Sequence, residues 1–94
     1  MRIDDLLRIA VADGASDLHI SAGSHPMLRN KGVLFPVPGQ SPITAKEVEE
    51  AMRTILDDTR WQMFLRDREL DFSHAIPGLA RVRMNACFER GNIS

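Results

Sequence analysis

Two arginines and an asparagine near the end of the chain form the pattern best suited to binding a ligand. Arg81, Arg83 and Asn85 alternate with apolar residues, and residues two apart on a strand project from the same face. The planar guanidinium group pairs through two N–H groups with the oxygens of a phosphate or a carboxylate. The row therefore indicates either an anion site or ion pairs across a hairpin, and spacing alone favours the hairpin pairs. The facing strand offers Glu69, Asp71 and Ser73 as partners.

Three histidines and one cysteine are the other candidates for chemistry. His19, His25 and His74 are expected on a strand, in a loop and on a hairpin, and no cysteine or carboxylate stands at a metal-ligand spacing from them. We therefore predict no metal site. Cys87 needs neighbouring cations to become a reactive thiolate, so a plain surface or interface cysteine is the simpler expectation. As the only cysteine, it cannot form an internal disulfide, which favours a reducing cytoplasm.

The motifs of self-sufficient enzymes are missing from these 94 residues. There is no G-x-x-x-x-G-K-[ST] phosphate loop, no C-x-x-C pair and no G-x-S-x-G nucleophile turn. We therefore predict no catalytic residue, no bound cofactor and no enzymatic activity for this chain alone.

Periodicity and breaker residues predict the elements that position the arginine row. Apolar residues at helical spacing predict a helix over residues 3–11 that stops at Gly14, and the T-x-x-E capping box at Thr44 begins a second helix. A third helix from Asp58 is expected to bury an aromatic face. Alternation predicts strands, which we place at residues 17–21, 27–29, 33–35, 69–76 and 81–88. The apolar side chains expected to face inward from the third helix are Trp61, Phe64 and Leu65.

Within the strand over residues 17–21, Leu18 and Ile20 are expected to point one way, and His19 and Ser21 the other. The order α-β-β-β-α-α-β-β predicts an α+β domain, with an antiparallel or mixed sheet and helices packed on one face. The final strand is expected to be exposed, so two copies could dimerise through it.

Composition limits the partners of this domain. Twelve basic and thirteen acidic residues give a net charge of −1, which speaks against nucleic acid because such binders need a basic excess. No apolar run approaches the roughly 20 residues of a membrane span. The length suits one domain, and its ending soon after a strand predicts that it was cut from a longer protein.

Three stretches resemble the motor ATPases of type IV pili and type II secretion. Residues 14–23, GASDLHISAG, are similar to the opening signature of that family, and Pro26–Arg29 with Lys31-Gly32 resembles its next hairpin. Residues 69–85 are similar to its closing hairpin, so the resemblance covers essentially the whole chain. Secretion and pilus-extension members typically follow the A-S-D-x-H string with Glu-Pro, whereas this chain has Ser21-Ala22-Gly23, which favours the PilT-like retraction branch or a paralogue of it.

The resemblance implies that residues 1–94 are a PAS-like N-terminal domain, joined in a longer protein to a RecA-like motor domain that this chain lacks. It implies a cytoplasmic homohexamer at the inner face of the cytoplasmic membrane, hydrolysing ATP with Mg²⁺ and acting indirectly on a membrane platform protein of the pilus. Each N-terminal domain would pack on the neighbouring subunit's motor domain. Carried over by position, Arg83, and after it Arg81 and Arg90, would contact the nucleotide phosphates there. The match at Arg90 is the least regular, because family members commonly carry Gln or Asn near residues 87–89.

Two other functions fit the residues themselves. A free-standing PAS-type sensory or ligand-binding module would need a cavity between helices and sheet. A binder of nucleic acid or an acidic surface would use the arginine row, against the balance of charge.

Overall fold

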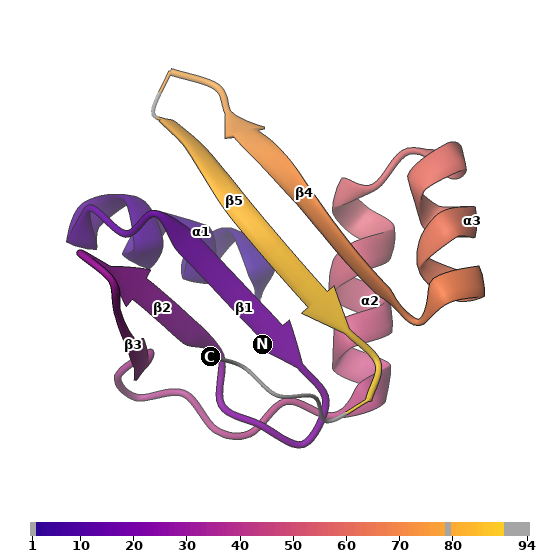
Figure 1. The fold of residues 1–94 in the computed structure, drawn as a ribbon, viewed down its shortest axis with the longest axis horizontal. Coiled ribbons are helices and arrows are strands. Elements are labelled where there is room, and N and C mark those ends of the chain that lie inside the picture. Colours follow the sequence, from indigo (N-terminus) through magenta and orange to yellow (C-terminus); the bar gives the residue numbers. More distant parts are fainter. Residues whose placement is uncertain (1, 79, 90–94) are drawn as a thin grey trace.

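The computed structural model describes residues 2–78 and 80–89, and this part of the chain folds into three helices and five strands in the predicted order (Figure 1). The helices are α1 (Ile3–Asp13), α2 (Ala45–Ile55) and α3 (Asp58–Asp67). The strands are β1 (Asp17–Ser21), β2 (Met27–Asn30), β3 (Val33–Pro36), β4 (Glu69–Ile76) and β5 (Ala80–Cys87).

The predicted helix ends are confirmed. α1 stops at Gly14, whose φ of 76° lies in the left-handed region where a Cβ is unfavourable. At the start of α2 the amide of Glu47 donates to the Thr44 hydroxyl at 3.1 Å, and the Thr44 amide donates to the Glu47 carboxylate at 3.1 Å. This reciprocal capping box satisfies two backbone donors that the helix itself leaves unpaired. Asp57 caps α3 through a single such bond, accepting from the Arg60 amide at 2.8 Å.

The five strands form one mixed sheet in the order β3-β2-β1-β5-β4. Neighbours are antiparallel except β1 and β5, which run parallel with Asp17 opposite Arg83 and His19 opposite Asn85. This pairing places the first strand of the chain beside the last (Figure 1). The predicted α+β class with a mixed sheet is therefore confirmed.

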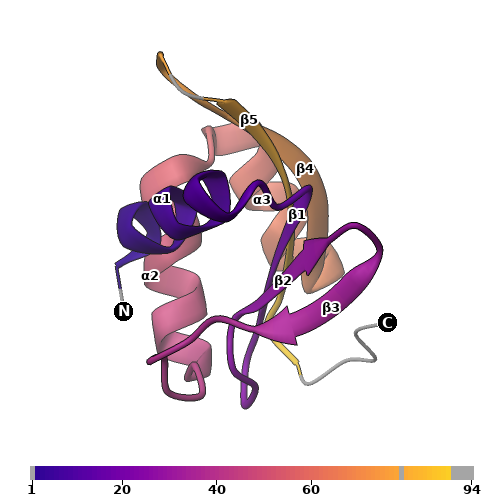
Figure 2. The same ribbon diagram turned by 90° about the vertical axis from the view of Figure 1, so that its left-hand side faces the viewer.

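The core lies between the sheet and the helices. Inward side chains of β1 and β5, among them Leu18, Ile20 and Met84, are fully buried, and α1 and α2 lie on one side of the sheet (Figure 2). On α3, Phe64 is fully buried and stacks on Phe88 with ring centroids 4.3 Å apart, so this helix covers the same face. The opposite face carries the polar residues of the strands.

The prediction of an exposed final strand is wrong. β5 lies between β1 and β4 and is hydrogen-bonded on both sides, and the sheet edges are β3 and β4. A strand paired on both sides has no free row of N–H and C=O groups to offer another chain. Edge-to-edge dimerisation through β5 (Ala80–Cys87) is therefore contradicted by its pairing with β1 and β4.

Ser21 lies opposite Cys87 of β5, is 2% exposed, and donates its hydroxyl proton to the Glu89 carbonyl at 3.0 Å. One smaller prediction, of a buried side chain on α3, is wrong. Leu65, expected in the core, is 39% exposed, because Trp61 and Phe64 alone fill the inward face of α3.

Candidate functional site

Six polar side chains from four strands line a hollow of about 160 Å³ on the sheet face that the helices leave open. We call it the sheet-face hollow. Asp17 and His19 come from β1, Arg29 from β2, Asp71 from β4, and Arg83 and Asn85 from β5.

The strand register explains why these residues meet. Asp17 is opposite Arg29 on one side and Arg83 on the other, so a carboxylate on β1 lies between guanidinium groups on β2 and β5. One step along, Asn85 is opposite both His19 and Asp71. Directly opposed side chains lie about 4.5–5.5 Å apart at Cβ. The parallel pairing of β1 with β5 therefore assembles the hollow from the two ends of the chain.

Arg83 is held on the sheet by two carboxylates. Its Nε and Nη2 donate to Asp71 at 3.2 and 2.7 Å, and its Nη1 lies 3.7 Å from Asp17. The hydrogen bonds from Arg83 lower the pKa of Asp71, and the same bonds raise the pKa of Arg83. The Arg83 side chain is nonetheless 65% exposed, so it is accessible to an external anion.

The cross-strand pairing that spacing favours is therefore what the structure contains. Arg81 follows the same pattern, donating from Nη1 to the Ser73 hydroxyl at 3.3 Å, and it lies outside the sheet-face hollow. Arg90 lies outside the described residues. Of the two predicted nucleotide-contacting arginines that the structure describes, Arg83 lines the hollow and Arg81 does not.

Sequence reasoning missed Asp17 and Arg29 as members of this site. Asp17 alternates with Leu18 in the same pattern that placed His19 on the polar face, so its direction was available from spacing. The position of Asp17 beside Arg83 could not be predicted from spacing, because it depends on the pairing of residues that are 66 positions apart in the chain.

His19 is the least satisfied group of the hollow. Its Nε2 atom is buried and has no hydrogen-bond partner among the described residues. Burial lowers the pKa of His19 below its ordinary value of 6.5; Asp17 acts in the opposite sense, and Arg29 and Arg83 lower it further. The imidazole is therefore kept neutral, among two carboxylates and two guanidinium groups.

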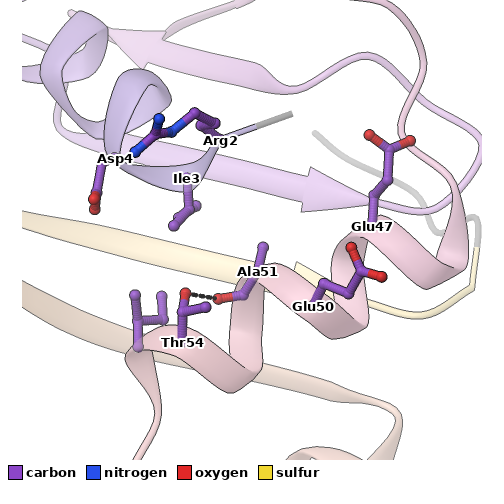
Figure 3. Close-up of a pocket in the computed structure, with 8 residues that line it drawn as sticks. Arg2, Ile3, Asp4, Glu47, Glu50, Ala51 and Thr54 are labelled. Carbon is purple, nitrogen blue, oxygen red and sulfur yellow. Dashed lines mark hydrogen bonds between the residues drawn. The ribbon is translucent and has the colours of Figure 1, made fainter.

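Two other hollows lie on the helix side. One, of about 360 Å³, lies between the start of α1 and α2, and its lining combines Asp4, Glu47 and Glu50 with apolar side chains that include Ile3 (Figure 3). The Glu47 carboxylate there is already engaged by the capping box, whose hydrogen bonds from Thr44 lower its pKa. The other, of about 290 Å³, lies between α1 and the β4–β5 turn and includes His74.

The remaining candidates lie apart from one another. The Nδ1 of the exposed His25 is 2.8 Å from the Gln40 carbonyl, and Cys87 is half-buried with a free thiol. Within residues 2–78 and 80–89, no three side chains of His, Cys, Asp and Glu gather at a distance suited to a metal ion. No helix in the same ranges has the length and apolar content to cross a membrane.

The chain is similar to proteins of the type IV pilus. It is 40% identical over 86 residues, 92% of its length, to the type IV pilus retraction ATPase PilT of Pseudomonas aeruginosa. The domain is related to the N-terminal domain of the PilT-like pilus ATPases. It is also 29% identical over 90 residues to the type IV pilus ATPase PilU of the same organism, and 29% identical over 94 residues to the uncharacterized protein YggR of Escherichia coli. No protein-family model matches the chain.

The fold agrees with this relationship. A crystal structure of the pilus retraction motor PilT with bound ADP superposes with a TM-score of 0.76 over 97% of the chain, at 24% identity. The PilT-like resemblance found in the sequence and the fold class that it implied are therefore confirmed. The chain spans about a quarter of the length of PilT, PilU and YggR, namely 25%, 23% and 28%.

Proposed function

We propose that residues 1–94 are the non-hydrolysing N-terminal domain of a pilus retraction ATPase. The similarity to PilT over 86 residues carries this proposal, because a fold by itself does not specify function. A RecA-like motor domain follows in the longer protein and supplies the phosphate loop that this chain lacks. The ATPase activity, with ATP and Mg²⁺ as ligands, belongs to that motor domain.

The domain's role in this proposal is to complete the nucleotide cleft of a neighbouring subunit. Arg83, together with Arg81 and Arg90, contacts the nucleotide phosphates when the domain packs on the adjacent motor domain. The exposed fork of Arg83 supports this role, because a guanidinium aimed at phosphoryl oxygens stabilises the charge that develops during hydrolysis. Asp71 and Asp17 then act as the resting partners of Arg83.

The assembly that goes with this role is a homohexameric ring in the cytoplasm, at the inner face of the cytoplasmic membrane. Each N-terminal domain transmits nucleotide-driven rotation between adjacent motor domains. The ring acts indirectly on an inner-membrane platform protein of the pilus and involves no nucleic acid.

The experiment compares full-length wild-type protein with its Arg83→Gln variant. Loss of a charge-assisted hydrogen bond of about 1.5–3 kcal/mol raises the KM for ATP or lowers kcat by about tenfold or more. Lys31→Gln is the matched control, since it removes an exposed cation from the β2–β3 turn. Size-exclusion chromatography establishes that each variant still assembles.

Two results contradict the proposal. One is an Arg83→Gln enzyme whose ATP hydrolysis equals that of the wild type. The other is tight binding of ATP–Mg²⁺ by the 94-residue chain in calorimetry, with a dissociation constant well under about 1 mM, near −4 kcal/mol, since the domain would then form a nucleotide site without a motor domain.

The sensory alternative is less well supported. A ligand-binding PAS-type module needs a roomy apolar cavity, whereas the three hollows described above are open to the surface, and each has charged side chains in its lining. A small molecule that co-purifies with the chain would favour the alternative.

A further inference from the structure

The sheet-face hollow contains a titratable group that the proposed nucleotide contact does not use. The Nε2 atom of His19 is buried beneath the hollow without a hydrogen-bond partner in the described part of the chain. Buried polar atoms in native proteins nearly always have a partner. Because Nε2 is unpaired in this state, we expect a second state in which it forms a hydrogen bond.

The charges that face His19 come from every strand around it. Asp17 lies two residues away on β1, Arg29 projects from β2, Arg83 from β5 and Asp71 from β4. Among the described residues around His19, two carboxylates and two guanidiniums balance while the imidazole is neutral. Asn85, opposite His19 on β5, adds an uncharged amide to the same row.

That balance depends on Arg83, because it bridges both carboxylates, with contacts of 2.7 Å to Asp71 and 3.7 Å to Asp17. If the guanidinium turns outward to an external anion, the hollow keeps two carboxylates and one guanidinium. Asp17 is the more enclosed of the two carboxylates, with a side chain only 14% exposed. Water therefore stabilises its negative charge less than it stabilises that of Asp71. A carboxylate left without its cation favours the charged form of a neighbouring imidazole.

We propose that His19 is the proton acceptor that restores charge balance when Arg83 leaves Asp71 and Asp17, so that anion binding by Arg83 is coupled to uptake of one proton. The imidazolium then donates a hydrogen bond to the carboxylate that Arg83 has released. In the resting state, burial and the nearby guanidiniums hold the pKa of His19 below its usual range, which keeps the site free of that proton. The link to nucleotide rests on the proposed function, whereas the exchange between Arg83 and His19 is a property of this chain.

The exchange is tested on the 94-residue chain by NMR titration of the three histidine rings. Arg83→Gln imitates the departed guanidinium, and we expect an upward shift in the pKa of His19 that His25 and His74 do not share. A His19 pKa that stays the same or falls overturns the proposal. Circular dichroism and the unchanged His25 and His74 signals verify that the variant is folded.

A cycle of variants separates partner exchange from simple loss of a positive neighbour. The His19 pKa is measured in wild type, Arg83→Gln, Asp17→Asn and the double variant. If His19 pairs with Asp17 only after Arg83 has gone, the upward shift caused by Arg83→Gln is much smaller in the Asp17→Asn background. An equal shift in both backgrounds overturns the exchange, because independent Coulomb effects add.

The nucleotide link is measured on the full-length protein. Coupling to one proton makes ATP affinity rise by up to about tenfold per unit decrease in pH between the two His19 pKa values, and His19→Gln removes this slope. A slope that persists in His19→Gln overturns the coupling. If Arg83→Gln leaves ATP affinity unchanged, the proposed function fails, while the His19 titration of the chain still decides the exchange.

Discussion

Removing the two sides of the Arg83–Asp71 pair separately and together measures how firmly this guanidinium is held on the sheet. The variants Arg83→Gln, Asp71→Asn and the double variant form a thermodynamic cycle, and the quantity of interest is the coupling free energy. It matters for function because a phosphate must displace the carboxylate before Arg83 can bind it.

The structure sets the expected size of that coupling. The pair is bidentate, at 3.2 and 2.7 Å, but its side chains are 65% and 47% exposed. Unit charges about 4 Å apart attract by about 1 kcal/mol in bulk water, and measured exposed pairs give about 0.2–1 kcal/mol. The two-point geometry places the Arg83–Asp71 pair at the upper end of this range, so we expect a coupling of about 1 kcal/mol; the attraction between Arg83 and Asp17 cancels in the cycle.

The assay is urea unfolding of the four proteins, followed by circular dichroism. The coupling should shrink at about 1 M salt, where the screening length is about 3 Å. The pair Arg66–Asp67 on α3 is a matched control, bidentate at 2.8 and 3.0 Å with side chains 69% and 45% exposed, and its coupling should be of similar size.

A coupling above about 3 kcal/mol, the range in which breaking a buried pair destabilises a protein, would refute the reasoning. Arg83 would then be locked to Asp71, and a phosphate could not displace the carboxylate. Insensitivity to salt would refute it as well, since an exposed pair must be screened.

Three further predictions concern the framework that holds the site. Phe64→Ala should lower the unfolding free energy by about 3–5 kcal/mol, because the ring is fully buried. Leu65→Ala on the exposed side of α3 should lower it by less than about 1 kcal/mol, and equal losses in urea unfolding would contradict the packing. Thr44→Ala should cost about 1 kcal/mol by removing the α2 cap, and an unchanged thermal midpoint would count against it. Burial lowers the pKa of His19 and of His74, so on acidification the unfolded chain takes up these protons before the folded chain does. The unfolding free energy should therefore be highest above about pH 6.5 and fall as the pH drops below it. An unfolding free energy that increases on acidification would contradict this prediction.

Most elements of the fold were predictable because their signals are local. Capping at Thr44, the stop at Gly14 and the alternation along β4 and β5 each depend on residues within one or two turns of one another. The cross-strand partners of Arg83 also followed from hairpin geometry, since β4 and β5 are joined by a short turn. The exposure of Leu65 was not predictable from helical spacing, which cannot tell how much of an apolar stripe the sheet covers.

Local sequence patterns predicted the helices, the hairpins, the inward and outward faces of most strands and the relationship to the PilT-like ATPases. The position of β5 inside the sheet, beside β1 and not at an edge, became known from the folded structure alone. Parallel pairing between strands far apart in the chain leaves no local pattern, because it is set by how the helices and the sheet bury their apolar faces together. This pairing brings Asp17 and His19 of β1 beside Arg83 of β5. The arginine therefore lies in a polar hollow with them and not only on a hairpin.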